Sequence, residues 1–148
     1  MQDFHNLRVW NEANDLTLAI NRLVQRFPRS NHGTLRNQMV RAAESIADNI
    51  AEGCGAATSA EFARFLDMSI KSASELENQI ERSHGYGLTR DRERDTLAAH
   101  VCNVRKMAWG LRKKVLAAPQ RPPDGPRTTA HGKRPTENGP RKTAHGKR

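Results

Sequence analysis

Apolar residues recur at every third or fourth position through most of the first 116 residues, which is the spacing of one face of an α-helix. No segment alternates between apolar and polar residues with a period of two, so the pattern predicts helices and no strands. The helical pattern covers four runs, at residues 7–27, 35–50, 62–80 and 97–115.

Signals for the ends of helices flank these runs. Pro28 ends the first helix, and Thr34 is predicted to be the N-cap of the second. Thr58 and Glu61 form a capping box at the start of the third helix. The remaining signals are a C-cap at Gly53, the turn Gly85-Tyr86-Gly87, a start of the fourth helix at Thr89 or Asp91, and its end before Pro119.

The four helices are expected to pack as an antiparallel up-down-up-down four-helix bundle, an all-α fold. The predicted connections are only about 3 to 7 residues long, and short connections make consecutive helices antiparallel. Four apolar side chains lie off the main stripes, namely Leu18, Val40, Ile70 and Trp109. Because a single bundle would expose them, we expect the chain to form a homo-oligomer.

A group of polar residues lies beside the apolar stripe near the end of the second helix. Ser45, Asn49 and Glu52 are spaced by four and three positions, so they share one helix face. We expect a buried or half-buried polar network in which Asn49 bridges to Ser72 or Ser74 of the third helix. The Glu52 carboxylate is expected to approach the positive N-terminal end of that helix.

The composition changes after residue 116. Residues 117–148 contain six of the seven prolines and no Val, Ile, Leu, Met, Phe, Trp or Tyr. Such a segment buries too little apolar surface to offset the entropy lost on ordering its backbone, so a disordered tail is predicted. A basic unit occurs in it twice, as PRTTAHGKR and PRKTAHGKR. We therefore divide the chain into a bundle at 1–116 and a tail at 117–148.

The chain is strongly basic, with a formal net charge of +9. The tail carries 8 Lys and Arg against 2 Asp and Glu, and residues 1–116 carry 17 against 14. Basic proteins attract polyanions, so RNA or DNA is the expected partner, held through its phosphates. The candidate phosphate-binding residues are Arg94, Arg105, Lys106, Arg112, Lys113 and Lys114 on the fourth helix, Arg22, Arg26 and Arg29 at the end of the first, and Lys133, Arg134, Lys147 and Arg148 in the tail.

Each basic group also has a purely structural interpretation. The stripe on the fourth helix is also what a solvated face that maintains solubility would look like. The arginines at the end of the first helix also complement the negative end of its dipole. Trp10 is expected to belong to the core rather than to stack on bases, whereas Trp109 is expected at a contact between subunits.

Other chemistry finds little support in the sequence. Cys54 and Cys102 form no CxxC pair, so we predict neither a zinc site nor a disulfide framework, which fits a cytoplasmic protein. Glu81 and His84 form one Glu-x-x-His motif, but di-iron bundles carry that motif on two helices. We identify no Ser-His nucleophile pattern, phosphate loop, signal peptide or membrane span. We expect a protein that is not an enzyme, with no cofactor, metal or membrane partner.

Several of these segments together resemble a known family of small bacterial four-helix bundle proteins. They are FHNLRVWNEA at 4–13, the pair Phe27-Pro28, QMVRAAESIADNIAEG at 38–53 and EFARFLDMSIKSASELENQI at 61–80. The family was first met as open reading frames in intervening sequences of large-subunit ribosomal RNA genes. It includes the accessory variability determinant of diversity-generating retroelements.

The resemblance implies a homopentamer with a central channel and a basic surface. In the retroelement members, the pentamer binds the reverse transcriptase and nucleic acid and supports error-prone copying of a template RNA into cDNA. The leading hypothesis is therefore a nucleic-acid-binding accessory scaffold for mutagenic reverse transcription. The alternative is a protein–protein interaction module with no direct nucleic-acid role, such as a ribosomal RNA intervening-sequence protein of unknown function.

Overall fold

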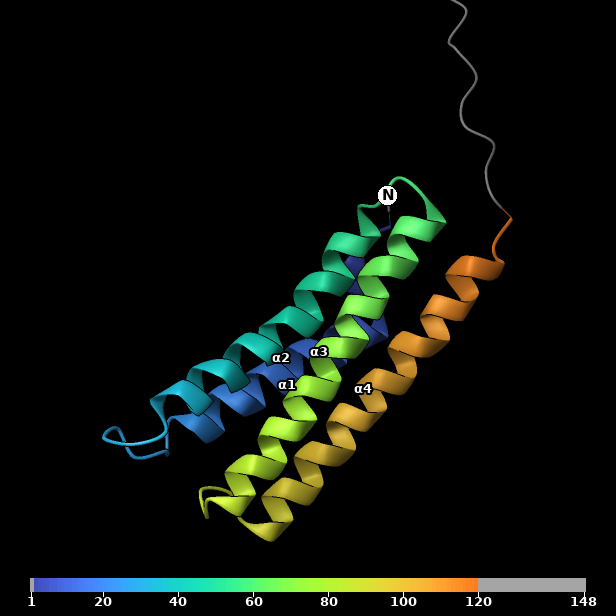
Figure 1. The fold of residues 1–148 in the computed structure, drawn as a ribbon. Coiled ribbons are helices and arrows are strands. Elements are labelled where there is room, and N and C mark those ends of the chain that lie inside the picture. Colours follow the sequence, from blue (N-terminus) through green and yellow to red (C-terminus); the bar gives the residue numbers. More distant parts are fainter. Residues whose placement is uncertain (1, 120–148) are drawn as a thin grey trace, which may run out of the picture.

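The computed structural model describes residues 2–119, which fold into consecutive helices (Figure 1). The elements are the short 3-10 helix η1 (Phe4–Asn6) and the α-helices α1 (Arg8–Val24), α2 (Gly33–Cys54), α3 (Ser59–Gly85) and α4 (Asp91–Ala117). Each α-helix packs on the next one in sequence. This part of the chain is an all-α up-down bundle, as predicted. The tail residues Lys133, Arg134, Lys147 and Arg148 lie outside the described residues.

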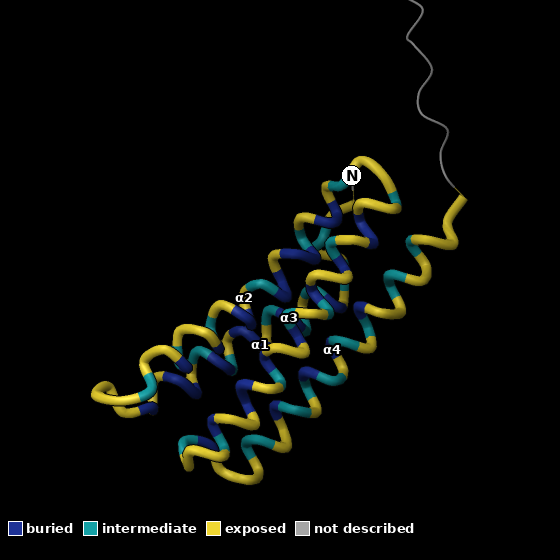
Figure 2. The backbone as a smooth tube through the Cα atoms, in the orientation of Figure 1, coloured by how far each residue is buried: buried dark blue, intermediate teal, exposed yellow. Residues whose placement is uncertain are grey.

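The predicted apolar stripes face the interior of the bundle. Figure 2 shows buried positions recurring along one side of each helix. Complete burial of one such side chain contributes about 1.5–3 kcal/mol relative to leaving it exposed. The largest fully buried apolar side chains are Leu16, Ile20, Met39, Ile46, Ile50, Leu66, Leu76, Ile80, Val101 and Val104. Ala108 is the last buried residue of α4, since Leu111 and Val115 are only half-buried.

The packing between α1 and α4 is the least extensive among the pairs of α-helices in contact. α4 runs alongside α3, whereas α1 crosses behind α3 and ends beside the start of α2 (Figure 1). Because α1 and α4 diverge, the bundle is more open on this side than between α2 and α3.

Two buried hydroxyl groups connect α2 to the helices on either side of it. Thr17 of α1 donates to the carbonyl of Ala43 at 3.1 Å. Ser69 of α3 donates to the carbonyl of Ile46 at 2.9 Å. The Thr17 hydroxyl also donates to Ala13 of its own helix at 3.0 Å, whereas Ser69 has no other acceptor within residues 2–119. An unpaired buried hydroxyl is costly, so the Ser69 bond favours one register of α2 and α3.

The predicted polar network between α2 and α3 forms, but with different connections. The hydroxyl oxygens of Ser45 and Ser72 lie 2.8 Å apart. Asn49 donates to the carbonyl of Ser45 at 2.7 Å and to its hydroxyl at 3.1 Å. Asn49 therefore reaches Ser72 only through Ser45, and it makes no hydrogen bond to Ser74 among the described residues.

The prediction for Glu52 is wrong. Its side chain is exposed and makes no hydrogen bond within residues 2–119. The start of α3 already has its own acceptors, because Thr58 Oγ1 accepts from the Glu61 N–H and Glu61 Oε2 accepts from the Ala57 N–H, both at 3.1 Å. The capping pair was thus predicted correctly, although Glu61 reaches one residue further back than expected.

Gly53 is not a C-cap, because α2 continues to Cys54. A Cβ atom on Gly53 would lie 2.5 Å from Phe62 Cδ2 and 3.1 Å from Phe65 Cβ. The glycine is therefore required by the close approach of α3.

Two other helix ends also differ from the prediction. α2 begins at Gly33, and its N-cap is His32 in the left-handed conformation, so Thr34 is not the cap. α1 ends at Val24, and Phe27 is buried in the turn that follows.

The four apolar residues predicted to be exposed divide into two pairs. Leu18 and Trp109 are 47% and 48% exposed. Val40 and Ile70 are half-buried and pack against the core, which corrects the prediction for them. Trp10, which was expected in the core, is half-buried and packs against the core beside Phe4, with 4.9 Å between the ring centroids.

Candidate nucleic-acid interface

Two of the arginines predicted to form a basic stripe on α4 lie against carboxylates of α3. Arg105 pairs with Glu77, whose hydrogen bond raises the pKa of the guanidinium. Arg112 Nε is 2.6 Å from Asp67 Oδ1, and its guanidinium also lies 5.0 Å from the centre of the Trp109 ring. The positive charges of both arginines are thus offset by the facing helix.

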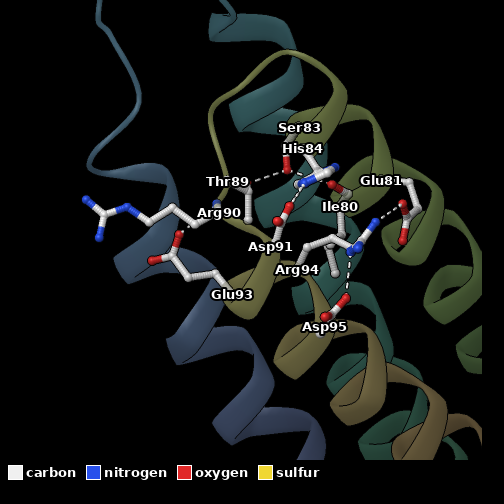
Figure 3. Close-up of polar contacts among 10 residues, drawn as sticks. All are labelled: Ile80, Glu81, Ser83, His84, Thr89, Arg90, Asp91, Glu93, Arg94 and Asp95. Atoms are coloured by element: carbon white, nitrogen blue, oxygen red, sulfur yellow. Dashed lines mark hydrogen bonds and ion pairs between the residues drawn. The ribbon is translucent and has the colours of Figure 1, made fainter.

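The third arginine of the stripe is paired as well. Arg94 donates from Nε to Asp95 Oδ1 at 2.7 Å and from Nη1 to Glu81 Oε2 at 3.4 Å (Figure 3). The bond to Asp95 raises the pKa of Arg94. The exposed cations of α4 that make no ion pair within residues 2–119 are Arg92 in its first turn and the lysines Lys106, Lys113 and Lys114.

A different surface, between the end of α1 and the start of α2, carries arginines without carboxylates. Its groove has a volume of about 910 Å³ and is lined by Arg29, Arg36 and Arg41 together with polar and apolar residues. Arg36 Nη2 donates to the carbonyls of Phe27 and Pro28, both at 3.0 Å, so Arg36 also holds the connection in place. Arg29 and Arg41 are exposed and make no ion pair with any described residue.

The turn between α3 and α4 fixes the position of two further arginines. The hydroxyl oxygens of Ser83 and Thr89 are buried and lie 2.6 Å apart. Glu93 Oε2 accepts from the backbone N–H of Arg90 at 3.1 Å, which closes the first turn of α4. Figure 3 shows the Arg90 guanidinium pointing away from the other labelled residues. Arg92 follows in the same turn.

Arg90 and Arg92 face the end of α1 across a second groove of about 640 Å³. Arg22 and Arg26 line its α1 side. Glu93 lies between them, and Arg26 Nη2 is 2.5 Å from its Oε1. The Arg90 N–H and, to a smaller extent, Arg26 hold the pKa of Glu93 below its ordinary value.

The two grooves lie on either side of the last turns of α1, and together they form what we call the arginine band. The band comprises Arg22, Arg26, Arg29, Arg36, Arg41, Arg90 and Arg92. Among the residues that line the two grooves, Glu93 is the one acidic residue. A surface of this kind attracts polyanions because its charge is not neutralised locally.

Only part of this band was predicted from the sequence. Arg22, Arg26 and Arg29 were predicted, whereas Arg36, Arg41, Arg90 and Arg92 were missed. A signal was present, because residues 16–43 contain five arginines and no Asp or Glu. This stretch therefore supplies no carboxylate to its own arginines, and Arg26 finds its partner, Glu93, on α4.

The Glu-x-x-His motif at the end of α3 makes ordinary polar contacts. Glu81 contacts Arg94, and His84 Nε2 lies 2.6 Å from Asp91 Oδ1, which lowers the pKa of Asp91 (Figure 3). No group of three or more His, Cys, Asp or Glu residues that could hold a metal ion occurs in residues 2–119. None of the helices in this range is both long and apolar enough to cross a bilayer.

Comparison with solved structures supports the fold. A crystal structure of a protein with unknown function from the S23 ribosomal protein family of Bacteroides thetaiotaomicron matches with a TM-score of 0.67 and 20% sequence identity. The match covers 71% of this chain and 98% of that chain. At this identity the similarity is evidence for the shared fold alone. A search of curated proteins found no match.

Comparison with protein families extends over most of the bundle. The model of the family described as 23S rRNA-intervening sequence protein matches residues 5–110, from just before α1 into the last third of α4. This agrees with the family resemblance that the sequence motifs indicated. The chain belongs to the 23S rRNA-intervening sequence protein family.

Proposed function

We propose that this protein is a non-catalytic scaffold that binds RNA or DNA through phosphate contacts of the arginine band. The observation that carries the proposal is the composition of the two grooves around α1, where seven arginines meet one carboxylate. Lys and Arg that neutralise phosphates release counterions from the nucleic acid, so a surface of unpaired guanidinium groups gains affinity at any sequence.

This proposal moves the main interface from α4 to the end of α1. Arg94, Arg105 and Arg112 of α4 are each held by an acidic residue of α3 or α4, so binding phosphate there would first require breaking an ion pair. The lysines of α4 contribute to the interface as a weaker, more distant group. The tail, with its predicted net charge of +6, adds to the attraction.

The finer part of the proposal concerns the partners of this scaffold. We propose that it acts beside a reverse transcriptase, holding template RNA or cDNA during mutagenic copying, as the resemblance to retroelement accessory proteins suggests. We also propose that it assembles with copies of itself, as a pentamer by the same resemblance. The exposed Leu18 and Trp109 support self-association, because contact with another subunit would remove them from water.

A second candidate function is a module that binds only proteins, as an rRNA intervening-sequence protein without a nucleic-acid role. Two observations favour it: the α4 arginines are already paired, and Met68, Trp109 and Leu116 on α3 and α4 are exposed. In this alternative the arginine band serves solubility and assembly.

One experiment distinguishes the two functions. The full chain is titrated into labelled RNA and single-stranded DNA over a series of salt concentrations, and fluorescence anisotropy reports binding. The proposal expects binding at low salt that weakens steeply as salt rises. No binding at any salt, together with a protein partner that co-purifies after nuclease treatment, would reject the proposal in favour of the second candidate.

A further inference from the structure

The groove between α1 and α4 differs from an ordinary phosphate-binding surface because its floor is apolar. Leu23 of α1 and Leu97 of α4 are buried at its base, and Ala19 and Thr96 form its sides. Its volume of about 640 Å³ is within the range of pockets that hold small organic ligands, about 300–1,000 Å³. A phosphate alone gains nothing from an apolar floor.

The rim of the same groove is cationic. Arg22, Arg90 and Arg92 are exposed there and make no ion pair within residues 2–119, whereas Arg26 is paired with Glu93. The Glu93 carboxylate already accepts from two donors, Arg26 and the Arg90 N–H, so it repels an incoming anion less than a free carboxylate would. Arg90 and Arg92 also lie at the positive end of α4, an unfavourable position that a bound anion would improve.

The groove therefore suits a ligand with a flat apolar body and an attached anionic group. A nucleotide has this combination, since the base offers an apolar face and the phosphate a charge. In a duplex the base faces are stacked on one another and only the phosphates are presented. In a single strand a base can leave the stack and enter a pocket, where guanidinium planes also stack on it.

We propose that the groove between α1 and α4 holds one unstacked nucleotide of a single-stranded nucleic acid, with the base on Leu23 and Leu97 and the phosphate at Arg22 and Arg92. This inference rests on the proposed function, because the strand reaches the groove along the arginine band. The band continues around the end of α1 to Arg29 and Arg41, so neighbouring phosphates of the same strand have partners there. A nucleic acid strand therefore fits the groove and the band better than an acidic peptide, which lacks the regular repeat of charge along its backbone.

The first test uses the unaltered full chain. We compare a 12-nucleotide single strand, the same strand with abasic sites, a 12-base-pair duplex and free uridine monophosphate by fluorescence anisotropy or competition at one low salt concentration. The intact strand should bind about tenfold more tightly than the abasic strand, because a stacked base adds affinity. Equal affinities of the intact and abasic strands would overturn the inference. Free uridine monophosphate competing as well as the whole strand would also overturn it.

The second test fills the groove without removing an arginine. Thr96 is exposed, so Thr96→Phe should place a ring in the groove, and Asn103→Phe is the control at an exposed position of α4 that lines neither groove. T96F should lower single-strand affinity about tenfold, leave duplex affinity unchanged and abolish the preference over the abasic strand. N103F should change none of these. Circular dichroism verifies that both variants are helical.

The outcomes separate the groove from the proposed function. If duplex binding depends on Arg29 and Arg41 and the intact and abasic strands bind equally well, the nucleotide site in the groove is rejected. The proposed phosphate-binding function is then retained. Absence of binding to every nucleic acid would overturn both. The last outcome concerns a labelled peptide of alternating Glu and Leu. If T96F weakens binding of this peptide, and the intact and abasic strands bind equally well, the groove is assigned to a protein partner and the inference is overturned.

Discussion

The arginines at the end of α1 and those along α4 are the same side chain in two different electrostatic surroundings. Arg22, Arg29 and Arg41 are exposed and lie on a helical hairpin without carboxylates between residues 16 and 43. On α4, Arg105 and Arg112 face acidic residues of α3 at ion-pair distance. The availability of an arginine for phosphate is thus decided by the helix that packs beside it.

The comparison also shows why counting charges along one helix is misleading. α4 is rich in Lys and Arg, yet its arginines contribute to the packing of α3 on α4. Residues 16–43, where α1 ends and α2 begins, have fewer cationic residues per turn than α4, but this stretch contains no acidic residue. Net charge over a contact surface, rather than over a segment, predicts attraction of a polyanion.

The largest expected effect comes from removing the unpaired arginines. The variant R22Q/R29Q/R41Q should bind RNA or single-stranded DNA roughly a hundredfold more weakly at low salt, and the slope of log affinity against log salt should fall by about 2. The measurement is anisotropy over a salt series. The matched control R94Q/R105Q/R112Q should keep its affinity within about threefold, because those charges are already offset. Equal losses in both variants would remove the distinction between the two regions.

The second prediction removes the ion-pair partners of Arg105 and Arg112 and leaves Arg94 with Asp95 alone. The variant D67N/E77Q/E81Q removes the three α3 carboxylates that lie beside Arg112, Arg105 and Arg94. Nucleic-acid affinity should rise by about tenfold at low salt and become more salt-dependent, as expected for added phosphate contacts. The same titration measures it. An unchanged salt slope would mean that α4 faces away from the nucleic acid.

The third prediction concerns stability. R105Q removes the ion pair with Glu77, whose side chains are partly exposed, and should lower the free energy of unfolding by about 0.5–1 kcal/mol. Urea denaturation followed by circular dichroism gives this value. R29Q serves as the comparison and should change stability by less than about 0.5 kcal/mol, since Arg29 is an exposed surface residue. A larger loss of stability in R29Q than in R105Q would contradict the conclusion that Arg105 contributes to the packing of α3 on α4.

The smallest effect is a pH dependence at Glu93. Its pKa in the folded protein is below the ordinary value of 4.5, so its contribution is fully present above pH 4.5 and is lost as the pH falls through the lowered pKa. E93Q should therefore be less stable than the unaltered protein at pH 7, by less than about 1 kcal/mol. The difference should shrink towards pH 3. Urea midpoints at both pH values measure it, and a constant difference would exclude this linkage.

The sequence alone predicted most of the bundle because helical periodicity is a local property. Leu16, Met39, Leu66 and Val101 belong to the predicted apolar stripes of the four helices, one on each, and all are buried. The error at Thr34 is one of position, because α2 begins one residue earlier with His32 as its N-cap, and the error at Gly53 arose because a tertiary contact explains that glycine. The approach of Phe62 to Gly53 depends on how α3 packs on α2, which spacing along one helix does not contain.

The candidate site was less predictable for the same physical reason. Whether Arg105 is free depends on the register that brings Glu77 opposite to it, 28 positions away in the chain. Glu52 was assigned to the start of α3 from its charge, although Thr58 and Glu61 already satisfy that end. In contrast, the absence of acidic residues from positions 16–43, the stretch that contains Arg36 and Arg41, was visible in the sequence and needed no structure.

The hydroxyl bonds from Thr17 and Ser69 to α2 restrict where such a protein tolerates changes in length. Inserting one residue between Ala43 and Ile46 would rotate one carbonyl by about 100° relative to the other, so one of the two bonds would be lost. Inserting residues in the connection between α1 and α2 leaves both bonds intact. Natural or engineered insertions are therefore best accommodated beside Arg29, where they alter the reach of the cationic surface and spare the interior.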